Sequence, residues 1–510
     1  MEYKAQTPLE RALSRVWRAT ARDRLPFFSA VVFGLMAHMF AFTNKLVNAD
    51  EIESLFGKGA TLTSGRWGLE AVKLIFPDYS MPWLYGLVSV LLLAVSVCLI
   101  IRLFDIRGAL TRVLLAGMIV AFPSQTGTFC FMFTSAPYAL SFLFAVLAAF
   151  LFCRGGWKNA ALAAVLMALS LGLYQSYIAL TASLLLVYAM KLCLDGEEGF
   201  KRIVAFCFKA LAFLLCALAL YALITLAVFK LTGTEFNDYV RENTNSAGLL
   251  GRIRMAYDFF VYYFTYREFA LITSNAANCA HIALAVICLV GVAVEAVKLI
   301  RAKDAPTAAL LALCVVLFPL SVNCMFLAMA KESIHTLVIY SFVSLYVLAA
   351  VITERAFCGG AIVKRAARDI VYTAFAVSLV SNVYFANEVY LDMYLEYENA
   401  YSFYSVLLAR AENTEGFDEN KTLALIGYQD NAVTVRDEID LGYITGPSRD
   451  LINIYSRENF LRRYMGTDIP LATQSELDAI AASAEFAAMN EYPYYGSIKI
   501  IDNYIVVKLG

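Results

Sequence analysis

The sequence predicts an all-α polytopic membrane protein with about eleven transmembrane helices and a small C-terminal α/β domain. The 510 residues are 60% hydrophobic and only 16% charged, and the mean hydropathy is +0.65. Soluble domains carry about 25% charged residues, so this composition excludes an ordinary soluble protein. A net charge of −1 gives no support for a nucleic-acid partner. The 11 cysteines are scattered without CxxC spacing and are interpreted as small apolar packing residues.

The apolar residues gather in runs that match the thickness of a bilayer, which takes about 20 residues of helix. The run from Ala160 to Leu194 is too long for one span, and we divide it where polar residues gather, at Leu173 to Ser176. The predicted spans are residues 26–43, 83–104, 109–122, 136–153, 158–173, 176–193, 203–229, 272–299, 306–329, 334–353 and 370–388.

Lys and Arg are distributed asymmetrically between alternate loops, which predicts a cytoplasmic N-terminus by the positive-inside rule. The segments placed inside are basic, whereas the short outer loops near 123–135 and 174–176 hold no charge. An odd number of spans then puts the C-terminus outside. The inner basic residues are Arg11, Arg15, Arg18, Arg22, Arg24, Arg102, Arg107, Arg112, Arg154, Lys158, Lys191, Lys201, Arg202, Lys298, Arg301, Lys303, Arg355, Lys364, Arg365 and Arg368.

Three parts of the chain follow from this topology. Residues 1–25 form a cytoplasmic segment, residues 26–388 form the transmembrane domain with outer loops 44–82 and 230–271, and residues 389–510 form an extracytoplasmic helix and a small α/β domain. We expect an amphipathic interfacial helix over 62–75 and an interfacial aromatic belt over 257–266. In the tail we expect a helix over 388–411, strands over 421–427, 497–501 and 504–508, and helices over 457–464 and 475–489.

Two adjacent carboxylates, Asp50 and Glu51, follow the first span and are the first candidates for chemistry. A loop fixed to the outer end of a span can hold a general base over a water-filled cavity, where it takes a proton from an acceptor hydroxyl. The competing interpretation is that both are solvated loop acids, or that they cap the helix that follows.

Two further pairs are candidates for binding a ligand near the membrane surface. Arg66 and Trp67 lie between two glycines, Gly65 and Gly68, before the second span. Arg66 could bind a lipid phosphate there, and Trp67 could stack on a sugar. Both could equally be interfacial anchors. Tyr174 and Gln175 are polar residues at membrane depth, where such residues usually face the bundle or a cavity. The alternative is a break between helices whose polar groups form hydrogen bonds locally.

A third pair, Lys331 and Glu332, lies at the outer end of a later span. Lys331 could pair with a phosphate, and the alternative is a surface ion pair between the two. With only three histidines in the chain, a histidine-based metal site is not expected. The second outer loop is also basic, which suits phosphate groups or lipid headgroups, through Arg241, Arg252, Arg254 and Arg267.

Three short motifs, in this order and placement, resemble the GtrII-type membrane glucosyltransferases, which glucosylate O-antigen and related bacterial surface polysaccharides. The resemblance covers roughly residues 20–430, and the family is similar in design to the GT-C glycosyltransferases. The motifs are Asn48-Ala49-Asp50-Glu51, Ser64-Gly65-Arg66-Trp67-Gly68 and Leu173-Tyr174-Gln175-Ser176.

The resemblance implies a polyprenyl-phosphate hexose donor, most simply undecaprenyl-phosphate glucose, made on the inner face of the bacterial cytoplasmic membrane and flipped outward. A donor synthase and a flippase would therefore act upstream, and the acceptor would be a cell-envelope polysaccharide. Asp50 would match the acidic residue of the first outer loop, with Glu51 beside it. One base and no separate carboxylate nucleophile favour an inverting reaction.

Two other classes stay open from the sequence. A transporter or flippase of lipid-linked saccharides predicts charges deep within spans, for which Lys209 and Glu295 are the main candidates. A polysaccharide polymerase or an O-acyltransferase shares the many spans, and an acyltransferase would use a membrane-embedded histidine such as His281. The sequence leaves open the acceptor, the sugar, the need for a divalent cation, the oligomeric state and the role of the tail.

Overall fold

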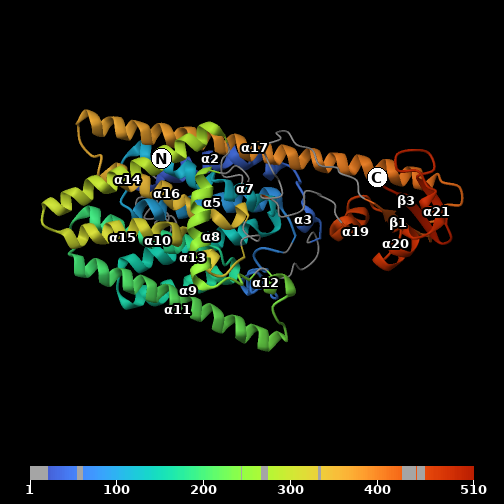
Figure 1. Ribbon diagram of the computed structural model, residues 1–510, viewed down its shortest axis with the longest axis horizontal. Helices are drawn as coiled ribbons and strands as arrows, with labels where there is room; N and C mark the ends of the chain where they lie inside the picture. Colours follow the sequence, from blue (N-terminus) through green and yellow to red (C-terminus); the bar gives the residue numbers. More distant parts are fainter. Residues whose placement is uncertain are drawn as a thin grey trace, which may run out of the picture.

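The computed structural model describes residues 21–53, 61–77, 79–242, 244–265, 274–330, 335–427, 444 and 454–510. It is a bundle of long helices, with a small domain held at one end by the extension of a single helix (Figure 1). The predicted all-α polytopic fold with a small C-terminal α/β domain is confirmed.

Ten helices among the described residues are long and apolar enough to cross a membrane, and one further apolar helix has 17 residues. Together they match the eleven predicted spans, including the division at Tyr174 to Ser176. They are α2 (Arg24–Thr43, preceded by η1, Ala21–Asp23), α5 (Pro82–Leu103), α6 (Ala109–Val120) followed by α7 (Pro123–Cys130), α8 (Met132–Arg154), the short α9 (Trp157–Leu173), α10 (Tyr177–Asp195), α11 (Phe200–Thr232), α14 (Asn275–Arg301), α15 (Ala305–Val322), η4 (Thr336–Phe342) continued by α16 (Val343–Arg355), and α17 (Ile362–Glu412).

Shorter helices occupy the loops that were predicted to lie outside: α3 (Ala49–Glu53), α4 (Trp67–Ala71), α12 (Asp238–Glu242) and α13 (Leu249–Thr265). A further short helix, η2 (Cys324–Leu327), lies within the predicted span 306–329, because α15 ends earlier, at Val322. One expectation is corrected here. Only α4 forms within 62–75, and Trp67, Gly68 and Leu69 of this helix are buried against the bundle. Within the aromatic stretch 257–266, Phe259 and Tyr263 of α13 are buried in the core, and an interfacial belt stays a prediction.

Charges predicted to lie inside gather at one end of the bundle, which we call the Arg102 end. Arg102 pairs with Asp23, and Asp105 pairs with Arg22 and Arg107. At the same end Asp195 pairs with Lys191 and Arg355. These ion pairs join η1 to α5 and the turn that follows it, and join α10 to α16, where the loops leave the bundle.

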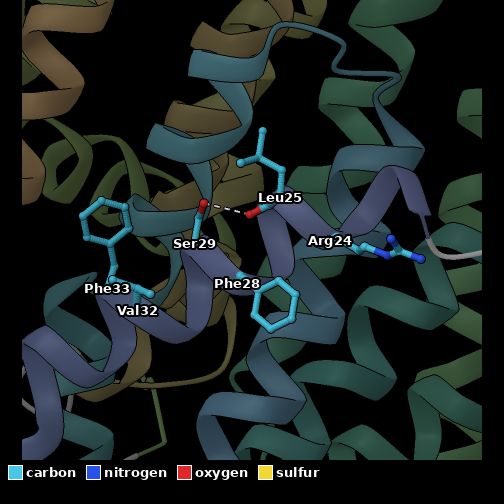
Figure 2. A pocket seen from close by; sticks show the side chains of 6 residues that line it. All are labelled: Arg24, Leu25, Phe28, Ser29, Val32 and Phe33. Carbon is cyan, nitrogen blue, oxygen red and sulfur yellow. Dashed lines mark hydrogen bonds between the residues drawn. The ribbon is translucent and has the colours of Figure 1, made fainter. Parts of the chain in front are cut away.

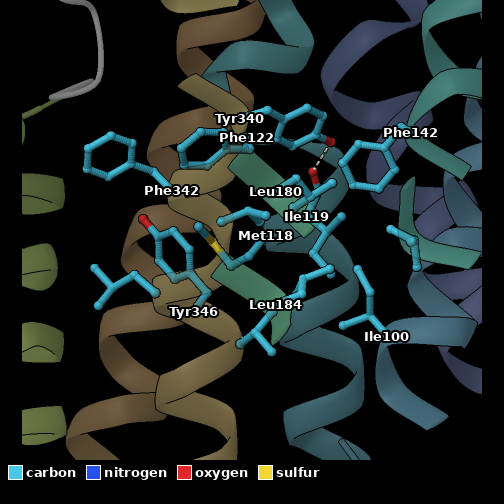
Figure 3. Close-up of a cluster of buried hydrophobic side chains, with 14 of the residues drawn as sticks. Ile100, Met118, Ile119, Phe122, Phe142, Leu180, Leu184, Tyr340, Phe342 and Tyr346 are labelled. Carbon is cyan, nitrogen blue, oxygen red and sulfur yellow. Dashed lines mark hydrogen bonds between the residues drawn. The ribbon is translucent and has the colours of Figure 1, made fainter. Parts of the chain in front are cut away.

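The centre of the bundle is filled by stacked aromatic and aliphatic side chains (Figure 3). Tyr340 stacks on Phe122 with ring centroids 5.8 Å apart and contacts Phe142 at 4.7 Å. Its hydroxyl donates to the Ile119 carbonyl at 2.6 Å. This bond satisfies a polar group in an apolar interior, where an unpaired hydroxyl would be costly.

The C-terminal domain stands on α17, whose 51 residues continue past the bundle (Figure 1). In this part of the chain the described strands form one sheet in the order β1-β3-β2, with β1 parallel and β2 antiparallel to β3. The elements are β1 (Thr422–Ile426), α19 (Ile454–Arg463), α20 (Gln474–Ala481), α21 (Ala484–Ala487), β2 (Ile498–Ile501) and β3 (Tyr504–Lys508). The single helix expected over 475–489 is two helices, because Ser483 leaves the helical path and caps α21 through the Phe486 N–H.

The core of this domain includes two residues from the loop after the first span. Val47 and Ile52 are fully buried in the same apolar cluster as Tyr404 of α17 and Phe460 of α19. Burying such a side chain contributes about 1.5–3 kcal/mol. The domain is therefore packed on α3, at the end of the bundle opposite to the Arg102 end.

Candidate functional site

The short helix α3 is fixed in place by Asn48. Its side-chain oxygen accepts from the Glu51 N–H at 2.8 Å, and its amide donates to the Cys130 carbonyl at 2.8 Å. The first bond starts the helix, since Asn is among the preferred N-cap residues. The second ties the loop to the end of α7, 82 residues further along the chain.

The adjacent carboxylates of α3 have different surroundings. Glu51 is 1% exposed, pairs with Lys45 at 2.6 Å and accepts from the Phe133 N–H at 3.3 Å. It therefore caps the N-terminus of α8, where a negative charge also interacts favourably with the helix dipole. Asp50 is exposed, and its carboxylate makes no hydrogen bond within the described part of the chain.

Asp50 is the carboxylate that is placed for proton transfer. Although water reaches it, the surrounding protein displaces enough solvent to raise the pKa of its carboxyl above the usual aspartate value. The Arg66 guanidinium opposes this by lowering the pKa, and the charges of Glu51 and Glu53 raise it. A raised carboxyl pKa brings a general base closer to neutral pH, where proton transfer is more efficient.

Arg66 lies close enough to Asp50 to act on its charge, so the structure brings together the two residues singled out by the sequence. Arg66 donates to the Tyr138 hydroxyl at 2.9 Å, and its guanidinium carbon lies 6.0 and 5.6 Å from the ring centres of Tyr138 and Tyr174. These rings stack on each other with centroids 4.2 Å apart. Cation–π contacts of this kind hold the guanidinium in a defined place.

Gln175 shapes the loop that carries Arg66. Its amide donates to the Ser64 carbonyl at 2.9 Å and to the Tyr221 hydroxyl at 3.1 Å, and that hydroxyl donates to the Gly65 carbonyl at 3.1 Å. Gly65 has a φ of +74°, and a side chain there would meet the same hydroxyl at 2.6 Å. The polar residues at 173–176 thus fix the conformation of the loop that carries Arg66 through hydrogen bonds.

Trp67 is buried, with 8% exposure, between α9 and α11. Its indole N–H donates to Thr225 at 3.2 Å, and its ring stacks on Tyr221. Its six-membered ring covers Gly172, where an added Cβ would lie 2.6 Å from the indole. The described contacts of Trp67 are those of an anchor for α4.

The remaining candidates lie elsewhere or outside the described residues. Lys331, Glu332 and Arg267 fall outside them. The other outer arginines have local partners: Arg241 pairs with Glu235, Arg252 donates to the Ala247 and Leu327 carbonyls, and Arg254 pairs with Asp258. Across the described ranges no group of three or more His, Cys, Asp or Glu side chains is arranged to hold a metal ion.

An apolar pocket of about 440 Å³ lies at the other end of α2, beside its first turns (Figure 2). The Ser29 hydroxyl is turned inward and donates to the Leu25 carbonyl at 2.7 Å. A 20-residue helix is about 30 Å long, so this pocket is separate from Asp50. Its lining is Arg24, Leu25, Phe28, Ser29, Val32 and Phe33.

The roles of two residues of the site were not predicted from the sequence. Tyr138 holds Arg66, but in the sequence it is one aromatic residue within an apolar span. Asn48 fixes α3, and its place two residues before Asp50 is the only local signal for that role.

Comparison with known proteins agrees with the motifs. The family model described as Glucosyl transferase GtrII matches residues 39–349, which is more than half of the chain and includes Asp50, Arg66 and Gln175. No curated protein and no solved structure gave a match. The chain therefore belongs to the GtrII glucosyltransferase family and is a polytopic membrane protein with a glucosyltransferase role.

Proposed function

We propose that this protein is an inverting glucosyltransferase of the bacterial cytoplasmic membrane that moves glucose from a polyprenyl phosphate, such as undecaprenyl phosphate, to a cell-envelope polysaccharide such as O-antigen on the outer face. The observation that carries the proposal is that an accessible carboxylate, Asp50, with no hydrogen bond among the described residues, lies within the electrostatic influence of a cation held by aromatic rings, Arg66. The family match supports the sugar.

The mechanism is a single displacement. The acceptor hydroxyl gives its proton to Asp50 as its oxygen forms a bond to the anomeric carbon. The bond from that carbon to the phosphate oxygen breaks on the opposite face, and the phosphate leaves with the electron pair. Arg66 stabilises the phosphate by charge, which a phosphate leaving group needs more than protonation.

Inversion is favoured because the other acids of α3 are engaged. A retaining reaction needs a second carboxyl about 5–5.5 Å from the first, acting as nucleophile. Glu51 is buried on Lys45 and the start of α8, and Glu53 accepts from Asn459. Both affect Asp50 through their charge.

The donor and acceptor define the partners. A donor synthase and a flippase would supply the lipid-linked glucose on the outer face, and membrane lipids would surround its isoprenoid chain. Lys331 and Glu332 stay predicted neighbours of the phosphate, as do Trp67, Tyr174 and Gln175 through the loop they shape. Measuring turnover with and without EDTA tests whether the reaction needs a divalent cation.

The test is glucose transfer from synthetic polyprenyl-phosphate glucose by purified protein. Asp50→Asn keeps the shape of the side chain but removes the proton acceptor, so turnover should fall about 10²–10⁴-fold, while binding of the labelled donor persists. Asp238→Asn is the matched control, because Asp238 is an exposed acid at the same end of the bundle. Wild-type turnover in Asp50→Asn would overturn the assignment of the base.

A further inference from the structure

The C-terminal domain contacts the helix that carries Asp50, and the role of this domain is not explained by the chemistry above. We propose that the domain positions the base of the glucosyltransferase site: α19 holds α3 so that the Asp50 carboxylate lies near Arg66. This inference rests on the proposed function. It assigns Asn459 and Phe460 as positioning residues.

The apolar part of the contact is made by residues on either side of Asp50. Val47 and Ile52 are both 0% exposed, and both belong to the apolar cluster of the C-terminal domain instead of the bundle core. Phe460 of α19 is also 0% exposed and stacks on Tyr464 with ring centroids 5.4 Å apart. The segment that carries Asp50 is therefore part of the hydrophobic core of this domain.

The polar part of the contact fixes the end of α3. The Asn459 amide donates to the Glu53 carboxylate, 406 residues away in the chain. Glu53 lies three residues after Asp50, so on a helix the two side chains are neighbours. The electrostatic effect of Glu53 on Asp50 is consistent with this closeness.

A second residue of this region, Tyr464, is influenced by the charge of Glu51. Burial raises the pKa of the Tyr464 hydroxyl above its usual range, and the charge of Glu51 adds to this effect. The Tyr464 oxygen is buried and makes no hydrogen bond within the described residues. The region of α19 thus contacts Glu53 through Asn459 and lies within electrostatic reach of Glu51 through Tyr464.

These contacts give α3 three supports. Glu51 joins it to α8, Asn48 joins it to α7, and Ile52 with Glu53 joins it to α19. A helix of five residues does not hold its own shape in water, so its position is set by such contacts. Removing one support should move the carboxylate, and a displacement of about 1 Å can cost about 10²-fold in rate.

The test exchanges the partners of the polar contact in the full-length protein. Asn459→Asp places two carboxylates against each other, and we expect kcat to fall about 10- to 100-fold while the donor KM stays within about twofold. Combining Asn459→Asp with Glu53→Gln restores one donor and one acceptor with their roles exchanged. That double variant should return to within about threefold of Glu53→Gln alone.

The controls separate positioning from general damage. Glu458→Gln alters the neighbouring residue, which is exposed and paired with Arg462, and should leave kcat unchanged. Asn459→Ala adds no charge, and it decides the question if Asn459→Asp does not fold. Kcat within twofold of wild type in the folded Asn459 variant, or equal loss in the single and double variants, would overturn the inference. Wild-type protein that transfers no glucose from polyprenyl-phosphate glucose would instead overturn the proposed donor.

Discussion

Asp50 and Glu51 are chemically similar neighbours on one short helix, yet their surroundings give them different roles. Glu51 is enclosed by Lys45 and the first turn of α8, whereas Asp50 is exposed and the charge of Arg66 opposes the rise that desolvation causes in its carboxyl pKa. Removing the charge of an enclosed carboxylate with two partners destabilises the fold, because it leaves those partners uncompensated. An exposed carboxylate with no hydrogen bond is the one that can accept a proton from a substrate.

This difference predicts that Glu51→Gln acts on stability. The amide keeps the shape but loses the charge that Lys45 and the α8 N-terminus stabilise, so the protein should lose about 1–3 kcal/mol. The measurement is the thermal denaturation midpoint in detergent, with Glu235→Gln, an exposed ion-pair residue, as the control. An unchanged midpoint together with a loss of turnover as large as that of Asp50→Asn would instead place Glu51 in the reaction.

The charges around Asp50 predict a pH dependence. Deprotonated Asp50 is the active form, so kcat/KM should fall at low pH, with its acid limb above the usual aspartate pKa. Arg66 lowers this pKa, so its removal in Arg66→Ala should raise the pKa and move the limb to higher pH. Arg66→Lys retains the positive charge and should move it less.

The control for this experiment is Arg241→Ala, which removes an exposed cation that has its own partners, Glu235 and Asp238. Its acid limb should coincide with that of wild type. If Arg66→Ala also left the limb in place, Asp50 would not be the group whose titration limits turnover.

At the scale of elements, close backbone contact decides how the Arg66 loop is held. A Cβ built on Gly68 of α4 would meet the Gly172 carbonyl of α9 at 2.8 Å. The absence of side chains at both positions lets α4 insert against α9, and Trp67, which directly follows Arg66 in the chain, packs on Gly172. The sequence shows two glycines far apart, and it cannot show that they touch.

This contact predicts that Gly172→Ala disturbs the site. The new methyl group would lie 2.6 Å from the Trp67 ring, and overpacking of this kind costs about 1–3 kcal/mol. Both the denaturation midpoint and the turnover should fall, because Arg66 adjoins Trp67. Gly199→Ala is the control, since nothing lies within 4 Å of a Cβ there. Equal behaviour of the two variants would refute tight packing at Gly172.

At the scale of the whole molecule, the bundle has two unlike ends. Ion pairs of Arg102, Asp105 and Asp195 join the helices at one end, and Asp50, Arg66 and the C-terminal domain lie at the other. The basic residues at the Arg102 end favour the cytoplasmic side by the positive-inside rule. The candidate site and the domain would then face outward.

Epitope tags test this orientation in the full-length protein. A tag after Gly510 should be accessible to antibody in intact spheroplasts, and a tag after Lys303 only after permeabilisation, since Lys303 lies in an exposed turn of a loop predicted to be cytoplasmic. Accessibility of the Lys303 tag in intact spheroplasts would reverse the assignment and place Asp50 in the cytoplasm.

Most of the fold could be predicted because the relevant signals are local. Hydrophobic runs gave the spans, and Asp502-Asn503 predicted the turn between β2 and β3. The prediction of an interfacial helix over 62–75 was wrong, because burial of α4 depends on the distant Gly172. Asp50 and Arg66 were found because charged side chains stand out in a chain that is only 16% charged, whereas Tyr138 was missed because aromatic residues are common within the apolar spans.

The sequence by itself determined the number and order of the membrane helices and the basic end of the bundle. It could do so because a bilayer selects for apolar composition and charge residue by residue. Only the tertiary structure decided which of two adjacent acids is accessible and what holds their helix. Neighbouring side chains on a helix point in different directions, and the partners of Glu51, Ile52 and Glu53 come from α8 and from a domain some 400 residues away. Such partnerships depend on packing between distant segments, which no local pattern records.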